Sequence, residues 1–530
     1  MKNISFIGKM AIGLIALLHP LAGCDTEELH DLNVNPNALT EVNVNFLFTA
    51  AELSTACNGA GGDNWYTNWR TNVGTCAYAV QQLAAVTGGI SQGDKYSENQ
   101  EASQGVWDWY YGDQLKNLVE VIKQTGKGGF EEGRRLNTRE AARILKVVNT
   151  HRLTDWFGNI PYTEANKGIE LIYKPKYDKQ QDIYTDMLKE LDEACANISA
   201  SNLDDGFAAS DMIYQGDISK WKKWGYSLML RLAMRISNVD AATAATYVSK
   251  AVTGGVFTSN ADNAVILMAT PQVWNNQNGL VRAFIDGSQP STLSKTLVDK
   301  LKGTNAGSAA DDDPRLMIIS GGVNGKTDPL VQQGMPNGLD LGTLDVYTGK
   351  TGTDINGTFS AFNSKFLDRD EPYMMMNYAE AELLMAEAKE RNIGTVPGTA
   401  QAHYDAGVKA AIQMYTLYDA SFAVSDGAVA TYLGQAYASY TGTTNEKLEK
   451  IGTQMWISKF LNWWDSWSDW RRTGYPVLVP TNYPGNLTNG QVPRKLKMPS
   501  SELARNPENY AAGATQPDTQ VGKVWWDGGN

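Results

Sequence analysis

The sequence predicts a mostly α fold, in which tetratricopeptide-like helical hairpins form a scaffold and a loop-rich lobe carries a few short strands. Apolar residues recur with helical spacing through residues 46–239 and 366–473. The candidate helices come in pairs about 30 to 40 residues apart, which is the period of stacked helical hairpins. Residues 240–365 are instead rich in Gly, Ser, Thr, Asn and Asp, with only short apolar runs. A plain irregular helical domain is the alternative to a repeat scaffold.

The first 24 residues predict export and lipid attachment. Lys2 and Lys9 accompany an apolar stretch at residues 10–18, which is shorter than the roughly 20 residues that span a membrane. Residues 21–24 (LAGC) place small residues before a cysteine and resemble a bacterial lipobox. We therefore predict a lipoprotein signal peptide at residues 1–23, attachment of outer-membrane lipid to Cys24, and a lipid-anchored tether at residues 24–45. An ordinary signal peptide with a chance cysteine is the alternative.

Helical signals dominate the first half of the body. The clearest candidate carries a broad apolar stripe at i, i+3, i+4 spacing, formed by Trp107, Tyr110, Leu118 and Ile122. The candidate helices of this half lie at residues 46–56, 71–86, 106–124, 138–156, 180–198 and 218–237.

Helices return after the loop-rich lobe, at residues 373–391, 402–418 and 446–462. The first two form the best single hairpin, because Tyr404 and Gly407 lie near the positions where such a repeat needs an aromatic and a small residue. Four tryptophans with helical spacing predict helix packing: Trp463, Trp464, Trp467 and Trp470. Pro and Gly then recur, which predicts an irregular C-terminal wrap at residues 474–530.

Charge and cysteine content exclude some classes of protein. Without residues 1–23 the chain keeps 44 basic and 58 acidic residues, a net charge of −14. Such a surface does not suit nucleic acid or anionic lipid. If Cys24 is acylated, three cysteines remain, and an odd number excludes a full disulfide framework. Cys57 and Cys76 could pair, and three inert buried thiols are the alternative.

No motif predicts catalysis, a metal or a cofactor. The sequence has no His-Glu-x-x-His pattern. Residues 89–93 match Gly-x-Ser-x-Gly, but the motif requires a strand, a turn and a helix, whereas here a helical run precedes it. Residues 320–327 resemble a phosphate loop with Ser320 in place of the required glycine. We therefore predict a protein that is not an enzyme.

Five stretches along nearly the whole mature chain carry a resemblance to a known family. They are NVNPN (33–37) with the helix that follows, LTDWFGNIPY (153–162), DPRL (313–316), YAEAELLMAEA (378–388), and WRRTGYP (470–476) with the tail VWWD (524–527). In this order, behind a lipobox, they resemble the SusD/RagB family of nutrient-binding outer-membrane lipoproteins, in its branch with an Asn-rich N-terminal motif.

The resemblance implies one SusD-like domain at residues 46–530, facing the outside of the outer membrane. It implies a binding protein that captures oligosaccharide and delivers it to a SusC-like TonB-dependent β-barrel transporter. A peptide-binding lipoprotein of the RagB kind, and a structural or interaction protein that uses helical repeats, are the alternatives. We expect most residues of these motifs to stabilise the fold rather than to contact a ligand. Arg471 and Arg472, for example, are candidates to pair with carboxylates such as Glu380 or Glu387.

Three loops have the composition of a glycan site, since sugar rings stack on Trp and Tyr while amides and Arg bind hydroxyls. Each loop places aromatic residues among amides or charges rather than among Leu and Val. The predicted ligand-binding residues are Trp65, Tyr66, Trp69 and Arg70 in the first loop, Tyr96 and Asn99 in the second, and Trp274, Asn275 and Asn276 in the third.

Overall fold

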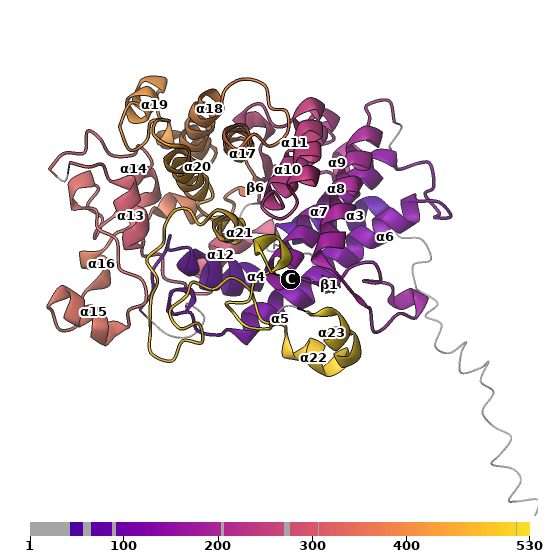
Figure 1. Ribbon diagram of the computed structural model, residues 1–530, viewed down its shortest axis with the longest axis horizontal. Coiled ribbons are helices and arrows are strands. Elements are labelled where there is room, and N and C mark those ends of the chain that lie inside the picture. The colour runs from indigo at the N-terminus through magenta and orange to yellow at the C-terminus, as the bar shows by residue number, and fades with distance from the viewer. Residues whose placement is uncertain are drawn as a thin grey trace, which may run out of the picture. The chain divides into compact units, whose positions relative to one another are not determined.

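The computed structural model describes residues 43–56, 65–86, 92–202, 206–269, 276–305, 307–515 and 517–529 (Figure 1). The predictions for the signal peptide, Cys24, residues 24–42 of the tether, Cys57, Trp274 and Asn275 fall outside these residues. The predicted end of the tether at residue 45 is wrong, since a helix begins at Val44. By its internal contacts the chain divides at residue 43, and Val44–Asn530 forms one compact unit. The mostly α prediction is confirmed, with few and short strands.

The first half of the body is a stack of antiparallel helices. Neighbours along the chain pack side by side, α7 on α8, α8 on α10 and α10 on α11, while α3 packs on α6 (Figure 1). A π-helical turn, η4 (Tyr110–Leu115), divides the long predicted helix at 106–124 into α5 and α6. The helices are α3 (Val44–Thr55), α5 (Gln100–Trp109), α6 (Lys116–Thr125), α7 (Leu136–Phe157), α8 (Gln180–Asn197), α9 (Phe207–Ser210), α10 (Ile218–Arg235) and α11 (Ala241–Gly254).

The second half repeats the hairpin pattern with α17 (Tyr378–Glu390) and α18 (Ala400–Gln413), followed by α20 (Thr444–Ser458) and α21 (Trp463–Thr473). A Cβ at Gly407 would lie 2.8 Å from Cγ of Leu383, so α18 approaches α17 closely only because that position is glycine. Shorter helical segments join the pairs: η10 (Met414–Leu417), η11 (Ala420–Phe422) and α19 (Asp426–Leu433).

The predicted start of the helix at residue 373 is wrong. Tyr373–Met376 is instead strand β6, which pairs antiparallel with β3 (Ala264–Ile266). The helix begins at Tyr378 because the Asn377 side chain accepts a hydrogen bond from the Glu380 backbone N–H at 2.8 Å.

The loop-rich lobe combines short helices with two-stranded sheets. β4 (Ser320–Gly322) pairs with β5 (Ala361–Phe362), and in the first half β1 (Ile160–Pro161) pairs with β2 (Tyr177–Asp178). The helical segments of the lobe are η6 (Asn260–Asp262), α12 (Gly279–Ile285), α13 (Lys295–Leu301), α14 (Leu316–Ile319), η8 (Pro329–Val331), α15 (Leu341–Thr348), α16 (Ile355–Thr358) and η9 (Ser364–Phe366).

The C-terminal tail crosses the helical body and ends in it. It carries only α22 (Ser500–Arg505), α23 (Pro507–Gly513) and the 3₁₀ turn η12 (Trp525–Asp527), seen in yellow in Figure 1. Trp526 is buried, and its indole N–H donates to Oδ1 of Asp155 on α7 at 2.8 Å. This contact fixes the end of the chain against the first half of the body.

The centre of the body holds charged side chains among the tryptophans of α21. Trp463, Trp464 and Trp467 are fully buried, as the helical spacing predicted. Arg231 on α10 binds Glu380 on α17 through two hydrogen bonds of 2.6 Å, and Lys459 lies 2.9 Å from the same carboxylate. Because a buried charge without a partner is costly, these pairs fix how the two helical halves meet.

Of the two arginines predicted to pair with carboxylates, one does so. Arg472 binds both oxygens of Glu387, at 2.5 and 2.6 Å. For Arg471 the prediction is wrong, since its guanidinium donates to the backbone carbonyls of Asp155 at 2.6 Å and Arg494 at 2.7 Å. Arg471 thus holds the tail to the body rather than neutralising an acid.

Candidate ligand-binding site

Three aromatic rings of the first predicted loop form one cluster. The short helix α4 (Trp65–Thr67) continues into the π-helix η2 (Asn68–Ala77). The centroids of Trp65 and Tyr66 lie 4.4 Å apart, and the Trp69 ring is 5.4 Å from each of them. π-Helical turns are rare and recur at functional sites. The local fold therefore gathers the three rings that the sequence singled out.

A glycine fixes the position of Trp69. Its indole N–H donates to the Gly287 carbonyl at 3.1 Å, and the Gln289 amide donates to the Trp69 backbone carbonyl at 3.1 Å. A Cβ at Gly287 would lie 2.6 Å from Cδ1 of Trp69, so the ring reaches this backbone only because the residue is glycine. The segment after α12 thereby orients a ring of the cluster.

Two guanidinium groups lie against the rings. The Arg70 guanidinium carbon is 5.1 Å from the Tyr66 centroid and 5.5 Å from that of Trp69, while Arg282 on α12 lies 5.0 Å from the Trp65 centroid. Cations at such distances are attracted to the ring faces. Arg70 also pairs at 3.1 Å with Glu101 in the first turn of α5, just after the second predicted loop.

A chain of charged contacts joins the first and third predicted loops. Arg282 Nε donates to Oδ2 of Asp286 at 2.9 Å, and Arg369 binds both oxygens of the same carboxylate at 2.5 and 3.0 Å. Arg369 also donates to Oε1 of Gln277 at 3.0 Å. The hydrogen bonds from Arg369, and then those from Arg282, hold the pKa of Asp286 below its usual value. The carboxylate therefore stays charged at neutral pH and keeps both arginines in place.

The side chains of the cluster differ in their exposure to solvent, and only some of them can contact a ligand. Trp65 is only 6% exposed and serves as packing, whereas Tyr66, Trp69 and Arg70 are half-buried. Half-buried rings beside a guanidinium can stack on the apolar face of a sugar while the cation donates to its hydroxyls. The arrangement suits binding of a polar, ring-containing ligand.

The second predicted loop has a different role in the structure. Tyr96 is fully buried, and its hydroxyl accepts from the Thr481 backbone N–H at 3.3 Å, so its ring has no exposed surface for a ligand. Asn99 caps α5 by accepting from the Ala102 N–H at 3.1 Å. Both line a cavity of about 20 Å³, which is the size of a water molecule rather than of a sugar.

Within the third predicted loop, the structure describes Asn276 but not Trp274 or Asn275. The Asn276 carbonyl accepts from the Ala269 N–H at 2.9 Å. Asn278, which the sequence did not single out, begins α12: its Oδ1 accepts from the Leu280 N–H at 2.8 Å, and its amide donates to the Glu371 carbonyl at 2.9 Å. This residue therefore sets the direction of the helix that carries Arg282.

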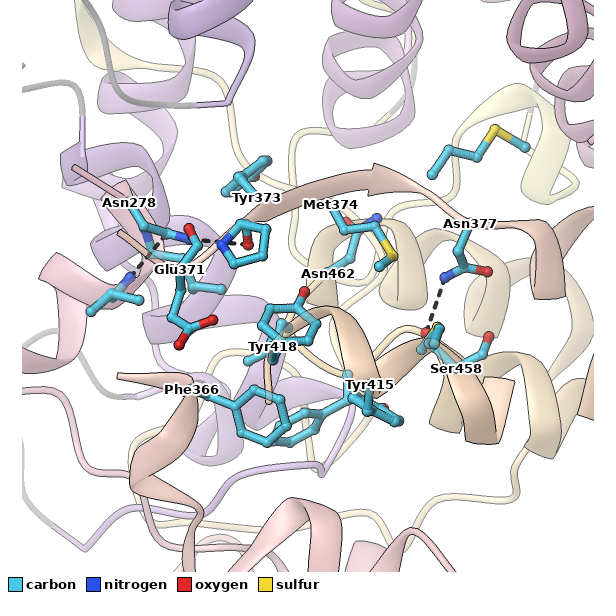
Figure 2. Close-up of a pocket in the computed structure, with 17 residues that line it drawn as sticks. Asn278, Phe366, Glu371, Tyr373, Met374, Asn377, Tyr415, Tyr418, Ser458 and Asn462 are labelled. Atoms are coloured by element: carbon cyan, nitrogen blue, oxygen red, sulfur yellow. Dashed lines mark hydrogen bonds between the residues drawn. The ribbon is translucent and has the colours of Figure 1, made fainter. Parts of the chain in front are cut away.

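A second feature missed from the sequence is a cavity of about 30 Å³ behind Asn278 (Figure 2). Figure 2 shows Glu371, Tyr418 and Phe366 around it. Burial, and then the nearby charges of Asp368, Asp370 and Asp419, raises the pKa of Glu371 to about 7. The volume suits one or two water molecules. Three acids within four residues, Asp368, Asp370 and Glu371, were the available signal in the sequence.

Larger hollows lie elsewhere on the body. One of about 600 Å³ lies between α13 and α20, and another of about 600 Å³ lies between α13 and the tail near Val479. Both have the volume of a small-ligand pocket. None of the residues predicted to bind ligand lines either of them. Shape alone therefore does not favour the aromatic cluster; its side-chain chemistry does.

The described residues contain no group of three or more His, Cys, Asp or Glu side chains that could hold a metal ion. Within the same described residues, no helix is both long and apolar enough to cross a membrane.

Comparison with known proteins gives one consistent family. Residues 36–499 match a SusD-like family model whose description is starch-binding and associating with the outer membrane. A solved chitin-binding protein is 32% identical, with a TM-score of 0.76 over 92% of this chain and 100% of that chain. A chitin-binding SusD homologue from Flavobacterium johnsoniae is 24% identical, with a TM-score of 0.75 over 91% and 98% of the two chains. A SusD homologue from Bacteroides uniformis is also 24% identical, with a TM-score of 0.74 over 92% and 100%. No curated protein matches the chain.

Proposed function

Because the chain belongs to the SusD-like family, we propose that it is a surface-exposed lipoprotein that captures oligosaccharide and delivers it to a TonB-dependent outer-membrane transporter. Cys24 would carry the lipid, and a SusC-like β-barrel would be the protein partner. The role needs binding and release, with no catalytic residue and no cofactor.

The observation that carries the proposal is the cluster of Tyr66, Trp69 and Arg70. It joins two half-buried rings, whose centroids lie 5.4 Å apart, to a guanidinium held by Glu101. Ring faces bind the C–H surface of a sugar, and the guanidinium donates to its hydroxyls. A partly open site of this kind binds in the micromolar to millimolar range, roughly −8 to −4 kcal/mol, which allows release to a transporter.

Chitin oligosaccharides are the first ligands to test, because the 32% identical relative is a chitin-binding protein. Arg70 and Asn276 would then bind hydroxyl and acetamido groups, while Tyr66 and Trp69 stack on the rings. Gln277 of the third loop is tied to the cluster through Arg369. The binding roles of Trp274 and Asn275 stay predictions from the sequence.

The test is a thermal-shift and calorimetric titration of residues 25–530 with chitin oligosaccharides, starch oligosaccharides and peptides. A ligand at about ten times its Kd stabilises the folded state by about 1.4 kcal/mol and must raise Tm. We expect a shift with one glycan class, which is lost in Tyr66→Ala and Trp69→Ala.

Tyr347→Ala is the matched control, since Tyr347 is an exposed tyrosine on α15. It should leave the glycan shift unchanged. A shift with peptides alone would move the function to peptide capture on the same scaffold. A glycan shift that survives both cluster variants would place the site elsewhere, for example in the hollow beside α20.

A further inference from the structure

The hollow between α13 and α20 has the size of a ligand pocket, about 600 Å³. Its walls come from α13, α18, α20 and the segment between α19 and α20 (Figure 1). Because it contains none of the residues predicted to bind glycan, a ligand of different chemistry can occupy it.

The uncharged polar groups of the walls are largely bonded within the protein. The hydroxyls of Tyr404 and Tyr437 each donate to a backbone carbonyl, that of Tyr404 at 2.7 Å. The Gln454 amide donates to the Tyr432 hydroxyl at 2.8 Å. A neutral sugar needs free donors and acceptors around it, and these side chains have few left. The tyrosines therefore offer ring surface to a ligand rather than hydroxyl groups.

The charged side chains that line the hollow balance in sign. They are Asp299, Lys300, Lys302, Glu446, Glu449 and Lys450. Asp299 pairs with Lys295 on the same helix, and Glu446 forms the capping box of α20. Lys302 donates to one backbone carbonyl at 3.3 Å, and Lys450 donates to three at 2.8 to 3.1 Å. The balance does not favour a polyanion or a polycation, and four of the six charges already serve the fold.

One charge of each sign remains: Lys300 on α13 and Glu449 on α20. Both side chains are half-buried, and among the described residues neither has a hydrogen bond or an ion pair. Two further acids beside the rim, Asp311 and Asp312, each accept a backbone N–H, at 2.7 and 2.8 Å. Because a half-buried charge is less screened than one in open water, an opposite charge on a ligand is attracted more strongly.

We propose that this hollow binds a small zwitterion, whose carboxylate pairs with Lys300 and whose ammonium group pairs with Glu449. The hydrocarbon between the two charges would lie against the ring of Tyr437, which is half-buried in the wall. Two charge-assisted hydrogen bonds then fix the orientation of the ligand. Free amino acids and the two termini of a short peptide both carry this pair of charges. The site is separate from the aromatic cluster and does not depend on glycan capture.

The test is calorimetric titration of residues 25–530 with α-alanine, β-alanine, γ-aminobutyrate, ε-aminocaproate and trialanine. This series varies the distance between ammonium and carboxylate. The carboxylate and the amine of the same length, and trialanine with both ends blocked, are the ligand controls. We expect the zwitterion of the best length to bind at least about tenfold more tightly than its singly charged analogues.

Two variants separate the two charges. Lys300→Met should lower the affinity for the zwitterion about tenfold and leave the affinity for the amine unchanged. Glu449→Gln should lower the affinity for the zwitterion by a similar factor and leave the affinity for the carboxylate unchanged. Lys350→Met and Glu508→Gln are the matched controls, since both side chains are exposed and neither lines the hollow. They should bind every ligand as wild type does.

The proposal would be overturned if no zwitterion binds, or if zwitterions bind no more tightly than their singly charged analogues. Tighter binding of trialanine than of the free amino acids would identify peptide termini as the source of the ligand, and the reverse would identify free amino acids. Lys300→Met should keep the glycan-induced shift in Tm, while Tyr66→Ala should keep the affinity for the zwitterion. Failure of one function is thereby distinguished from failure of the other.

Discussion

The indole N–H of Trp69 donates to the backbone carbonyl of Gly287 at 3.1 Å, across more than two hundred residues of sequence. The contact places a ring of the first predicted loop under the control of the segment that follows α12. The geometry of the aromatic cluster therefore depends on a tertiary contact. A substitution at a residue that is not aromatic can change this geometry.

Gly287→Ala should displace Trp69. The added Cβ would lie 2.6 Å from both Cδ1 of Trp69 and the Ala283 carbonyl oxygen, so the ring must move. We expect glycan affinity to fall about tenfold, which corresponds to about 1.4 kcal/mol. Calorimetric titration measures it. Gly105→Ala on α5 is the control, since its Cβ would meet nothing within 4 Å. It should keep the affinity and add about 0.5 to 1 kcal/mol of stability.

Asp286→Asn should loosen the link between the two loops. The neutral amide leaves Arg282 and Arg369 without their shared negative charge. Because the carboxylate is partly exposed, we expect a loss of about 1 kcal/mol in the free energy of unfolding, measured with urea. Glycan affinity should fall with it. Asp299→Asn, at an exposed pair with Lys295, should change neither quantity by more than a few tenths of a kcal/mol. An equal effect of both substitutions would contradict a special role for Asp286.

Glu371 should make stability depend on pH. Its pKa is raised from 4.5 to about 7, so the folded state binds this proton more tightly than the unfolded chain does. Stability is therefore lost as pH rises from about 4.5 to about 7, and the loss is constant above that window. Glu371→Gln removes the buried charge and should stabilise the protein by about 1 kcal/mol at pH 8, with little effect at pH 5. Urea midpoints at both pH values measure this. Glu508→Gln, at an exposed position on α23, should leave both midpoints unchanged.

Local patterns predicted the helices well where neighbours in sequence are also neighbours in space. The hairpin of α17 and α18 depends on a small residue, Gly407, that the repeat spacing identified. The start of α17 was misplaced because residues 373–376 suit a helix or a strand equally. Their partner, β3, lies more than one hundred residues earlier, and it selected the strand.

The candidate site shows the same limit. Composition found Trp65, Tyr66, Trp69 and Arg70, because aromatic residues among amides stand out in a sequence. It could not reveal the link through Arg282, Asp286 and Arg369, since these residues come from separate segments and none belongs to a motif. It also misjudged Tyr96, whose polar neighbours suggested exposure, whereas the tail at Thr481 covers it.

Arg472 and Glu387 belong to two different sequence motifs and form a buried ion pair. Substitutions of these two residues test how much the pair stabilises the core. Among the described residues, Arg472→Met leaves the buried Glu387 carboxylate with Arg391 as its one charged partner, at 2.7 Å. We expect a loss of about 3 kcal/mol in the free energy of unfolding. Glu387→Met should lower the free energy of unfolding by a similar amount, since the Arg472 guanidinium stays buried and loses the Glu387 carboxylate. The double variant should recover part of the loss, because two apolar side chains can replace a buried pair. Urea unfolding of the four proteins measures the coupling, and strictly additive losses would show that the pair contributes no energy of its own.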